Sequence, residues 1–173
     1  MLLALISSCK YSCSAGEGKH VKTKTITSDV NTALNGAVIK NDIDIEAQGI
    51  KLREAYLLDA ENKPLAENVA SLEEKIYLVI QTDTGWIKEN GKSFIGAGER
   101  ISTAEGKVIV DATDIFSEYD GTGLPADKAG AITLSARITQ VDPGVENFIV
   151  KFRVWDKRGN GEIKGTYKFR IRK

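Results

Sequence analysis

The sequence predicts an all-β protein, built as a single antiparallel β-sandwich of about seven strands. Three observations support this fold class. From about residue 43 onward, apolar and polar residues alternate with a period of two, as in strands that bury one face. Turn-forming residues recur about every 8–12 positions, the spacing typical of sandwiches. No segment has the 3.6-residue period of a long helix, and no apolar run approaches the ~20 residues of a spanning helix.

The first predicted strands surround a glycine. Apolar residues alternate with acidic and amide side chains over residues 43–48, Gly49 interrupts the pattern, and alternation resumes over residues 50–58. Glycine inside a strand pattern commonly marks a bulge or a bend. Residues 75–82 are more continuously apolar, which predicts a central strand buried on both faces.

Later strands follow the same alternation. Asn90-Gly91 predicts a tight hairpin turn that joins residues 86–88 to residues 93–95. A short strand is expected at residues 107–110, and three longer strands close the chain. We expect these at residues 131–140, 147–156 and 163–172.

The junction of the last two strands has a specific pattern, Val154-Trp155-Asp156-Lys157-Arg158-Gly159-Asn160-Gly161. We expect Asp156 to cap the turn through its side chain, and the Gly and Asn residues to adopt left-handed backbone. This segment resembles the V-x-D-x-x-G-N hairpin near the end of bacterial extracellular immunoglobulin-like domains. The resemblance implies an immunoglobulin-like sandwich outside the cytoplasm, and no chemistry.

The N-terminus has a pattern of its own. Residues 2–6 are apolar, and Ser7-Ser8-Cys9 follow. The segment Ile6-Ser7-Ser8-Cys9 resembles the lipobox of bacterial lipoproteins, which implies lipidation of Cys9 and attachment to a cell envelope, on the periplasmic face or the cell surface. The apolar run is short and has no basic residue before it, so we expect the true start to lie upstream of Met1. The alternative is an ordinary terminus with incidental cysteines, or a disulfide between Cys9 and Cys13.

This interpretation divides the chain into three parts. Residues 1–9 are a partial signal segment, residues 10–40 are a solvated tether rich in Ser, Thr, Lys, Gly and Asn, and residues 41–173 are the sandwich domain. A composition like that of the tether buries too little apolar surface to offset the entropy of ordering the chain. Residues 21–27 could still form an edge strand.

Composition excludes several functional classes. Both cysteines lie before residue 14, so a zinc cluster or a cysteine nucleophile inside the domain is excluded. The single histidine, His20, lies in the tether, which argues against a Ser-His-Asp triad. Basic and acidic residues number 24 each, so no overall field favours nucleic acid. We therefore expect no enzyme and no cofactor; a hydrolase based on carboxylates alone is the weaker alternative.

Residues 111–120 form an acidic run that could supply calcium ligands. The candidates are Asp111, Asp114, Glu118 and Asp120, with Asp127 nearby. Their spacing misses the alternate-position pattern of an EF-hand loop. The favoured interpretation is structural: Asp111 caps a short helix, Asp114 lies in its first turn, Gly121 ends it, and Ile115 and Phe116 close the end of the sandwich.

The two tryptophans are candidate platforms for a glycan or a protein partner. If Val154 faces inward, Trp155 faces outward beside Arg153 and Ile149. Trp86 precedes the Asn90-Gly91 turn and could lie at a rim or anchor a loop. The alternative for Trp155, which we favour, is packing under a loop or the tether.

Charge is unevenly distributed along the chain. The last 28 residues are rich in lysine and arginine, whereas the charged residues within 99–127 are mostly acidic. The basic strands could meet anionic headgroups or an acidic glycan. We favour the interpretation in which the two regions neutralise each other. Taken together, the sequence predicts a cell-envelope lipoprotein that acts as a non-enzymatic binding or structural module for an envelope protein or a glycan, with a calcium-dependent or carbohydrate-binding module as the alternative.

Overall fold

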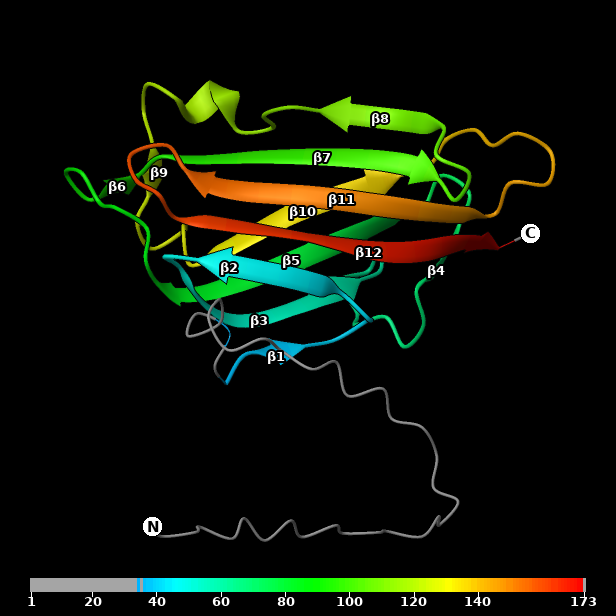
Figure 1. The fold of residues 1–173 in the computed structure, drawn as a ribbon, viewed down its shortest axis with the longest axis horizontal. Helices are drawn as coiled ribbons and strands as arrows, with labels where there is room; N and C mark the ends of the chain where they lie inside the picture. The colour runs from blue at the N-terminus through cyan, green and yellow to red at the C-terminus, as the bar shows by residue number, and fades with distance from the viewer. Residues whose placement is uncertain (1–33, 35, 173) are drawn as a thin grey trace, which may run out of the picture.

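A computed structural model describes residues 34 and 36–172 of the chain. The predicted lipidation site Cys9, His20 and most of the predicted tether lie outside these residues. Two β-sheets stack face to face as a sandwich (Figure 1), which confirms the predicted all-β class. In the described part of the chain the sole helical element is a single 3-10 turn, η1 (Ser117–Tyr119). No helix there is long and apolar enough to cross a membrane.

Sheet A has four strands in the order β1-β3-β5-β10. They are β1 (Val38–Ile39), β3 (Lys51–Leu58), β5 (Lys75–Thr84) and β10 (Ala131–Arg137). β1 runs parallel to β3, and the other pairs are antiparallel. β1 falls within the range that the sequence assigned to the tether.

Sheet B has six strands, five of them in the order β2-β12-β11-β7-β8, and β4 pairs in parallel with the end of β12. They are β2 (Asp44–Gln48), β4 (Val69–Ser71), β7 (Ile95–Thr103), β8 (Val108–Ala112), β11 (Asn147–Asp156) and β12 (Glu162–Arg172). β6 (Lys92–Ser93) and β9 (Leu124–Pro125) form a small separate pair. The described chain thus has twelve strands instead of about seven, because several short edge strands carry no visible alternation.

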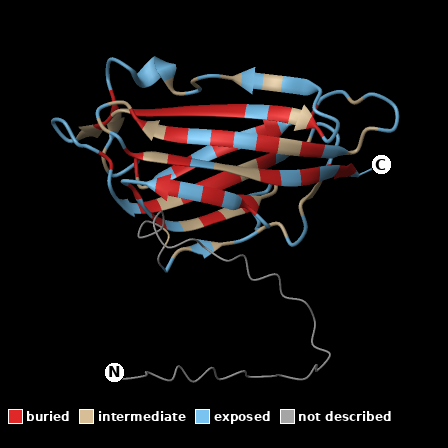
Figure 2. Ribbon diagram, viewed as in Figure 1, coloured by how far each residue is buried: buried red, intermediate tan, exposed pale blue. Residues whose placement is uncertain are grey.

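The period-two pattern supplies the core. Along β11 and β12, buried and exposed residues alternate (Figure 2), so each strand sends one set of side chains between the sheets. Phe148 and Phe169, neighbours on these strands, stack with ring centroids 5.4 Å apart. Each fully buried aliphatic or aromatic side chain stabilises the fold by roughly 1.5–3 kcal/mol. The interior is therefore held by apolar packing, as expected of a domain without cysteine.

Gly49 is a corner between the sheets. It adopts φ 68° between β2, which belongs to sheet B, and β3, which belongs to sheet A. A side chain there would be strained, because this left-handed region favours glycine. The predicted bend is therefore the point at which the chain crosses from one layer to the other.

Two turn predictions hold in part. Asn90 and Gly91 both have positive φ, and Glu89 and Lys92 exchange backbone hydrogen bonds, as in a tight hairpin turn. The residues before the turn, however, form no strand. In the last hairpin Asp156 does cap the turn, but Gly159 and Asn160 have no positive φ. A Cβ on Gly159 would lie 2.7 Å from Cδ1 of Ile87, so the exposed end of that side chain packs closely on the turn.

Candidate functional site

The acidic run forms no helix at its start, which corrects the predicted cap. Asp111 lies in β8 and pairs with Arg100 of β7, with 2.6 Å between the guanidinium and the carboxylate. The Arg100 hydrogen bond holds the pKa of Asp111 below its usual value. Phe116 is partly buried against the core, whereas Ile115 is 41% exposed, so only one of the two closes the sandwich.

Asp114 and Asp120 are joined by a lysine from the other end of the chain. The Lys157 ammonium lies 2.6 Å from Oδ2 of Asp114 and also contacts Asp120. Oδ1 of Asp114 accepts hydrogen bonds from the backbone N–H groups of Ala97 and Phe116. Burial alone would raise the pKa of Asp114, but these bonds outweigh it and the pKa falls below its usual value. Asp114 thus links its own loop to β7, through the N–H of Ala97, and to the last hairpin, through Lys157.

The four calcium candidates therefore have other roles or lie apart. Glu118 lies beside Tyr119, whose pKa its charge raises. Within residues 34 and 36–172 no three carboxylate, imidazole or thiol groups gather in a way that could hold a metal ion. The positive charge that Asp114 and Asp120 share is the ammonium of Lys157.

Trp86 belongs to the core. It is 9% exposed, and its indole N–H donates to Oγ1 of Thr82 at 2.9 Å. Burial removes it from the predicted partner surface. A single tryptophan before a turn gives no alternation from which this burial could have been predicted.

Trp155 faces outward on sheet B, as the alternation predicts, but both of its faces are covered. An ideal Cβ on Gly96 would lie 2.2 Å from the indole, so the ring lies directly on the backbone of β7. The guanidinium of Arg153 lies 4.8 Å from the ring centroid on the indole and also pairs with Glu162. A sugar ring needs an open aromatic face. Trp155 and Arg153 therefore form a packed cluster and not an open platform.

Two carboxylates in the described chain are buried, Glu99 and Asp156, each 4% exposed. Asp156 accepts hydrogen bonds from the backbone N–H groups of Ile87 and Arg158. Asp156 pairs with Ile95 in the sheet register, four positions from Glu99, so their Cα atoms lie roughly 13 Å apart along the strands.

A groove of about 1220 Å³ lies on sheet B. It lies beside β12 between Thr166, which pairs with the first residue of β2, Asp44, and Arg170, which pairs with the first residue of β4, Val69. Residues of the preceding loops and of β11 complete it. We call it the β12 groove. Its polar lining comprises Lys40, Asn41, Asp42, Asp44, Glu67, Asn68, Asn147, Thr166, Lys168 and Arg170.

Two asparagines hold the wall of the β12 groove in place. The amide of Asn41 accepts from the backbone N–H of Leu57 and donates to the carbonyl of Leu65. The amide of Asn68 donates to the carbonyls of Asn41 and Lys168. These bonds tie the loops before β2 and β4 to the edge of β12. The groove is therefore shaped before any ligand arrives.

The charges lining the β12 groove balance. Three basic residues, Lys40, Lys168 and Arg170, and three acidic residues, Asp42, Asp44 and Glu67, line it. Sequence analysis missed this groove, because its residues come from five separate segments. The one local signal was the turn Asn41-Asp42, where both residues adopt positive φ.

Comparison with known proteins adds a similarity of shape. The sequence matches no family model, and no curated protein matches it. Among solved structures the chain is similar to the C-terminal domain of wzt, with a TM-score of 0.49 and 7% sequence identity over 84% of this chain and 87% of that chain. This is a similarity of overall chain path between β-rich domains, and it carries no ligand or activity over to this protein.

Proposed function

We propose that this protein is a cell-envelope lipoprotein whose β-sandwich binds a glycan in the β12 groove without catalysing a reaction. The groove is the observation that carries this proposal. Its lining places donors and acceptors side by side with no net charge. Sugar hydroxyls donate and accept at once, so a mixed lining of this kind suits a neutral polyhydroxylated ligand. The aromatic residues of the lining, Phe148, Tyr167 and Phe169, are each at most 4% exposed, so they offer a protein partner little aromatic contact area.

The test is binding to a glycan array, followed by titration of each glycan that binds. Lys168→Ala and Asn147→Ala each remove an exposed polar side chain from the groove. Either change should weaken binding by about tenfold, the usual cost of one hydrogen bond to a charged or amide group. Lys164→Ala is the matched control: it lies on the same strand outside the groove and pairs with Glu46. Failure to bind any glycan, or equal loss in the control, would contradict the proposal.

The anchor needs a separate test, since Cys9 lies outside the described residues. Cys9→Ala and Cys13→Ala should be expressed from the native locus, so that any upstream signal is retained. We expect the Cys13 variant to remain in the membrane fraction and the Cys9 variant to leave it. If both variants stay with the membrane, the lipidation proposal is wrong while the groove proposal stands.

A further inference from the structure

The outward face of sheet A differs in chemistry from that of sheet B. On sheet B, neighbouring outward positions carry charges, for example Lys164 beside Arg153 and Lys151 beside Arg100. On sheet A the register instead brings together Tyr56, Val79 and Thr133 in one row, and Leu58, Tyr77 and Ser135 in the next. The solvated face of an antiparallel sheet is normally polar, so an uncharged centre with two tyrosines is a departure that requires a reason.

This surface, which we call the tyrosine face, consists of Arg53, Tyr56, Tyr77, Val79, Gln81 and Thr133. Val79 is 7% exposed although it lies at an outward position of β5, so neighbouring side chains cover it. Along the adjacent edge strand β10, the outward residues Ala131, Thr133 and Ser135 are small and exposed. The tyrosine side chains therefore project further from the sheet than the small side chains of β10.

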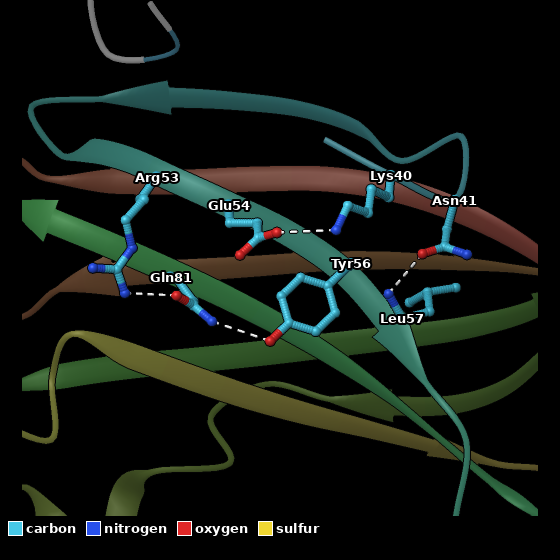
Figure 3. Close-up of polar contacts among 7 residues, drawn as sticks. All are labelled: Lys40, Asn41, Arg53, Glu54, Tyr56, Leu57 and Gln81. Carbon is cyan, nitrogen blue, oxygen red and sulfur yellow. Dashed lines mark hydrogen bonds and ion pairs between the residues drawn. The ribbon is translucent and has the colours of Figure 1, made fainter. Parts of the chain in front are cut away.

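A chain of hydrogen bonds fixes the polar groups of this face (Figure 3). The Arg53 guanidinium donates to Oε1 of Gln81 at 2.6 Å, and Nε2 of Gln81 donates to the Tyr56 hydroxyl at 3.0 Å. Since the Tyr56 oxygen accepts the hydrogen bond from Gln81, the hydroxyl can donate its own proton to another acceptor. The second N–H of Gln81 and the remaining N–H groups of Arg53 are also donors. These hydrogen-bonded side chains therefore present a row of donors to a ligand.

The charge near the row is positive. Asp83 is shared by Lys51 and Arg53, at 3.5 Å and 3.8 Å. Glu54, the other carboxylate of the region, is engaged by Lys40 at 3.1 Å. Two cations therefore share one carboxylate at the end of the tyrosine face where Arg53 lies. A carboxylate on a ligand would complete this arrangement, because a guanidinium binds carboxylates in a fixed geometry.

We propose that the tyrosine face is a second binding site, specific for a saccharide that carries a carboxylate group. The ammonium of Lys40 lies 5.5 Å from the centroid of Tyr56, so we assign the stacking role to Tyr77, which packs against the apolar face of one sugar ring. Tyr77 and Gln81 are four positions apart on β5, roughly 13 Å. The row of donors from Arg53 to Tyr56 therefore receives the carboxylate and hydroxyls of a sugar further along the same oligosaccharide. The site lies on the layer opposite the β12 groove and does not depend on the neutral glycan proposed there.

The test uses the full chain and a set of oligosaccharides of galacturonate, mannuronate and glucuronate, each with its methyl-ester form, measured by calorimetry. The wild-type chain should bind at least one acidic oligosaccharide more tightly than its neutral ester. Arg53→Gln should weaken the acidic ligand by about tenfold or more and leave the ester unchanged, since it removes the charge-assisted bond alone. Tyr77→Ala should weaken both forms, because stacking does not depend on the carboxylate.

The matched control is Arg153→Gln on sheet B, an exposed arginine that, like Arg53, pairs with a carboxylate, here Glu162. It should change neither affinity. Binding of no acidic oligosaccharide by the wild-type chain would overturn the proposal, as would equal losses in the Arg53 and Arg153 variants. Circular dichroism of each variant verifies that the sandwich is intact. Lys168→Ala separates the two sites: it affects the β12 groove and leaves the tyrosine face unchanged.

Discussion

The buried carboxyl of Glu99 makes the stability of this protein depend on pH in an unusual direction. Glu99 lies on β7, is 4% exposed, and its Oε1 has no hydrogen-bond partner. Burial raises its pKa from 4.5 to about 7. The nearby hydroxyl of Tyr167 is also buried without a partner, and its pKa is raised by burial first and by the charge of Glu99 second. The folded state therefore favours the protonated, neutral carboxyl.

The sign and size of the effect follow from this pKa. Because the pKa in the folded state exceeds that in the unfolded chain, the stability from this group is complete below pH 4.5 and is lost as the pH rises through about 7. A shift of this size corresponds to about 3 kcal/mol, of which about 2.5 kcal/mol is lost between about pH 5 and pH 8. Domains of this kind have a total stability of roughly 5–15 kcal/mol, so the loss is a large fraction.

Urea unfolding monitored by tryptophan fluorescence across this pH range measures the effect. Glu99→Gln keeps the shape of the side chain and removes its titration, so its stability should be nearly flat while that of the wild type falls. The difference between the two profiles isolates Glu99, because every other group is common to both proteins. A difference that does not change with pH, or a wild type that gains stability as the pH rises, would refute the reasoning.

Two further predictions concern stability. Asp156→Ala leaves the backbone N–H groups of Ile87 and Arg158 without their acceptors and should lower the free energy of unfolding by about 3 kcal/mol in urea titration, whereas Asp156→Asn, which keeps an acceptor, should cost less. Gly96→Ala places a Cβ about 2.2 Å from the Trp155 indole and should cost about 1–3 kcal/mol. In a Trp155→Ala background the same change should cost little. An equal cost in both backgrounds would show that contact with the indole is not the reason why position 96 requires glycine.

Much of the fold follows from local alternation. The strands at residues 147–156 and 163–172 were predicted almost to the residue, because each buries one continuous face. The alternation could not assign strands to sheets. Residues on either side of Gly49 show the same pattern, yet β2 joins sheet B and β3 joins sheet A. That choice depends on which distant strand offers free backbone groups, and no local signal carries this information.

The candidate sites were less predictable. Asp111 and Asp114 lie in one acidic run, but their partners are Arg100 and Lys157, one nearby and one far along the chain. The expected neutralisation between the basic last 28 residues and the acidic residues 99–127 occurs where Lys157 pairs with Asp114 and Asp120. The β12 groove and the tyrosine face each combine segments separated by many residues. Their residues can therefore be recognised as sites only when the strand pairing is known.

By itself the sequence determined the strand class, the inward set of side chains along the longer strands, and the cap at Asp156. Each of these depends on neighbours within a few positions, where period and residue type decide the outcome. Tertiary structure alone decided that Trp86 is buried, that Trp155 is covered by Arg153, and that Glu99 points into the core. Those outcomes depend on sheet register and on what the opposite layer covers, because a side chain is buried by its spatial neighbours and not by its position in the chain.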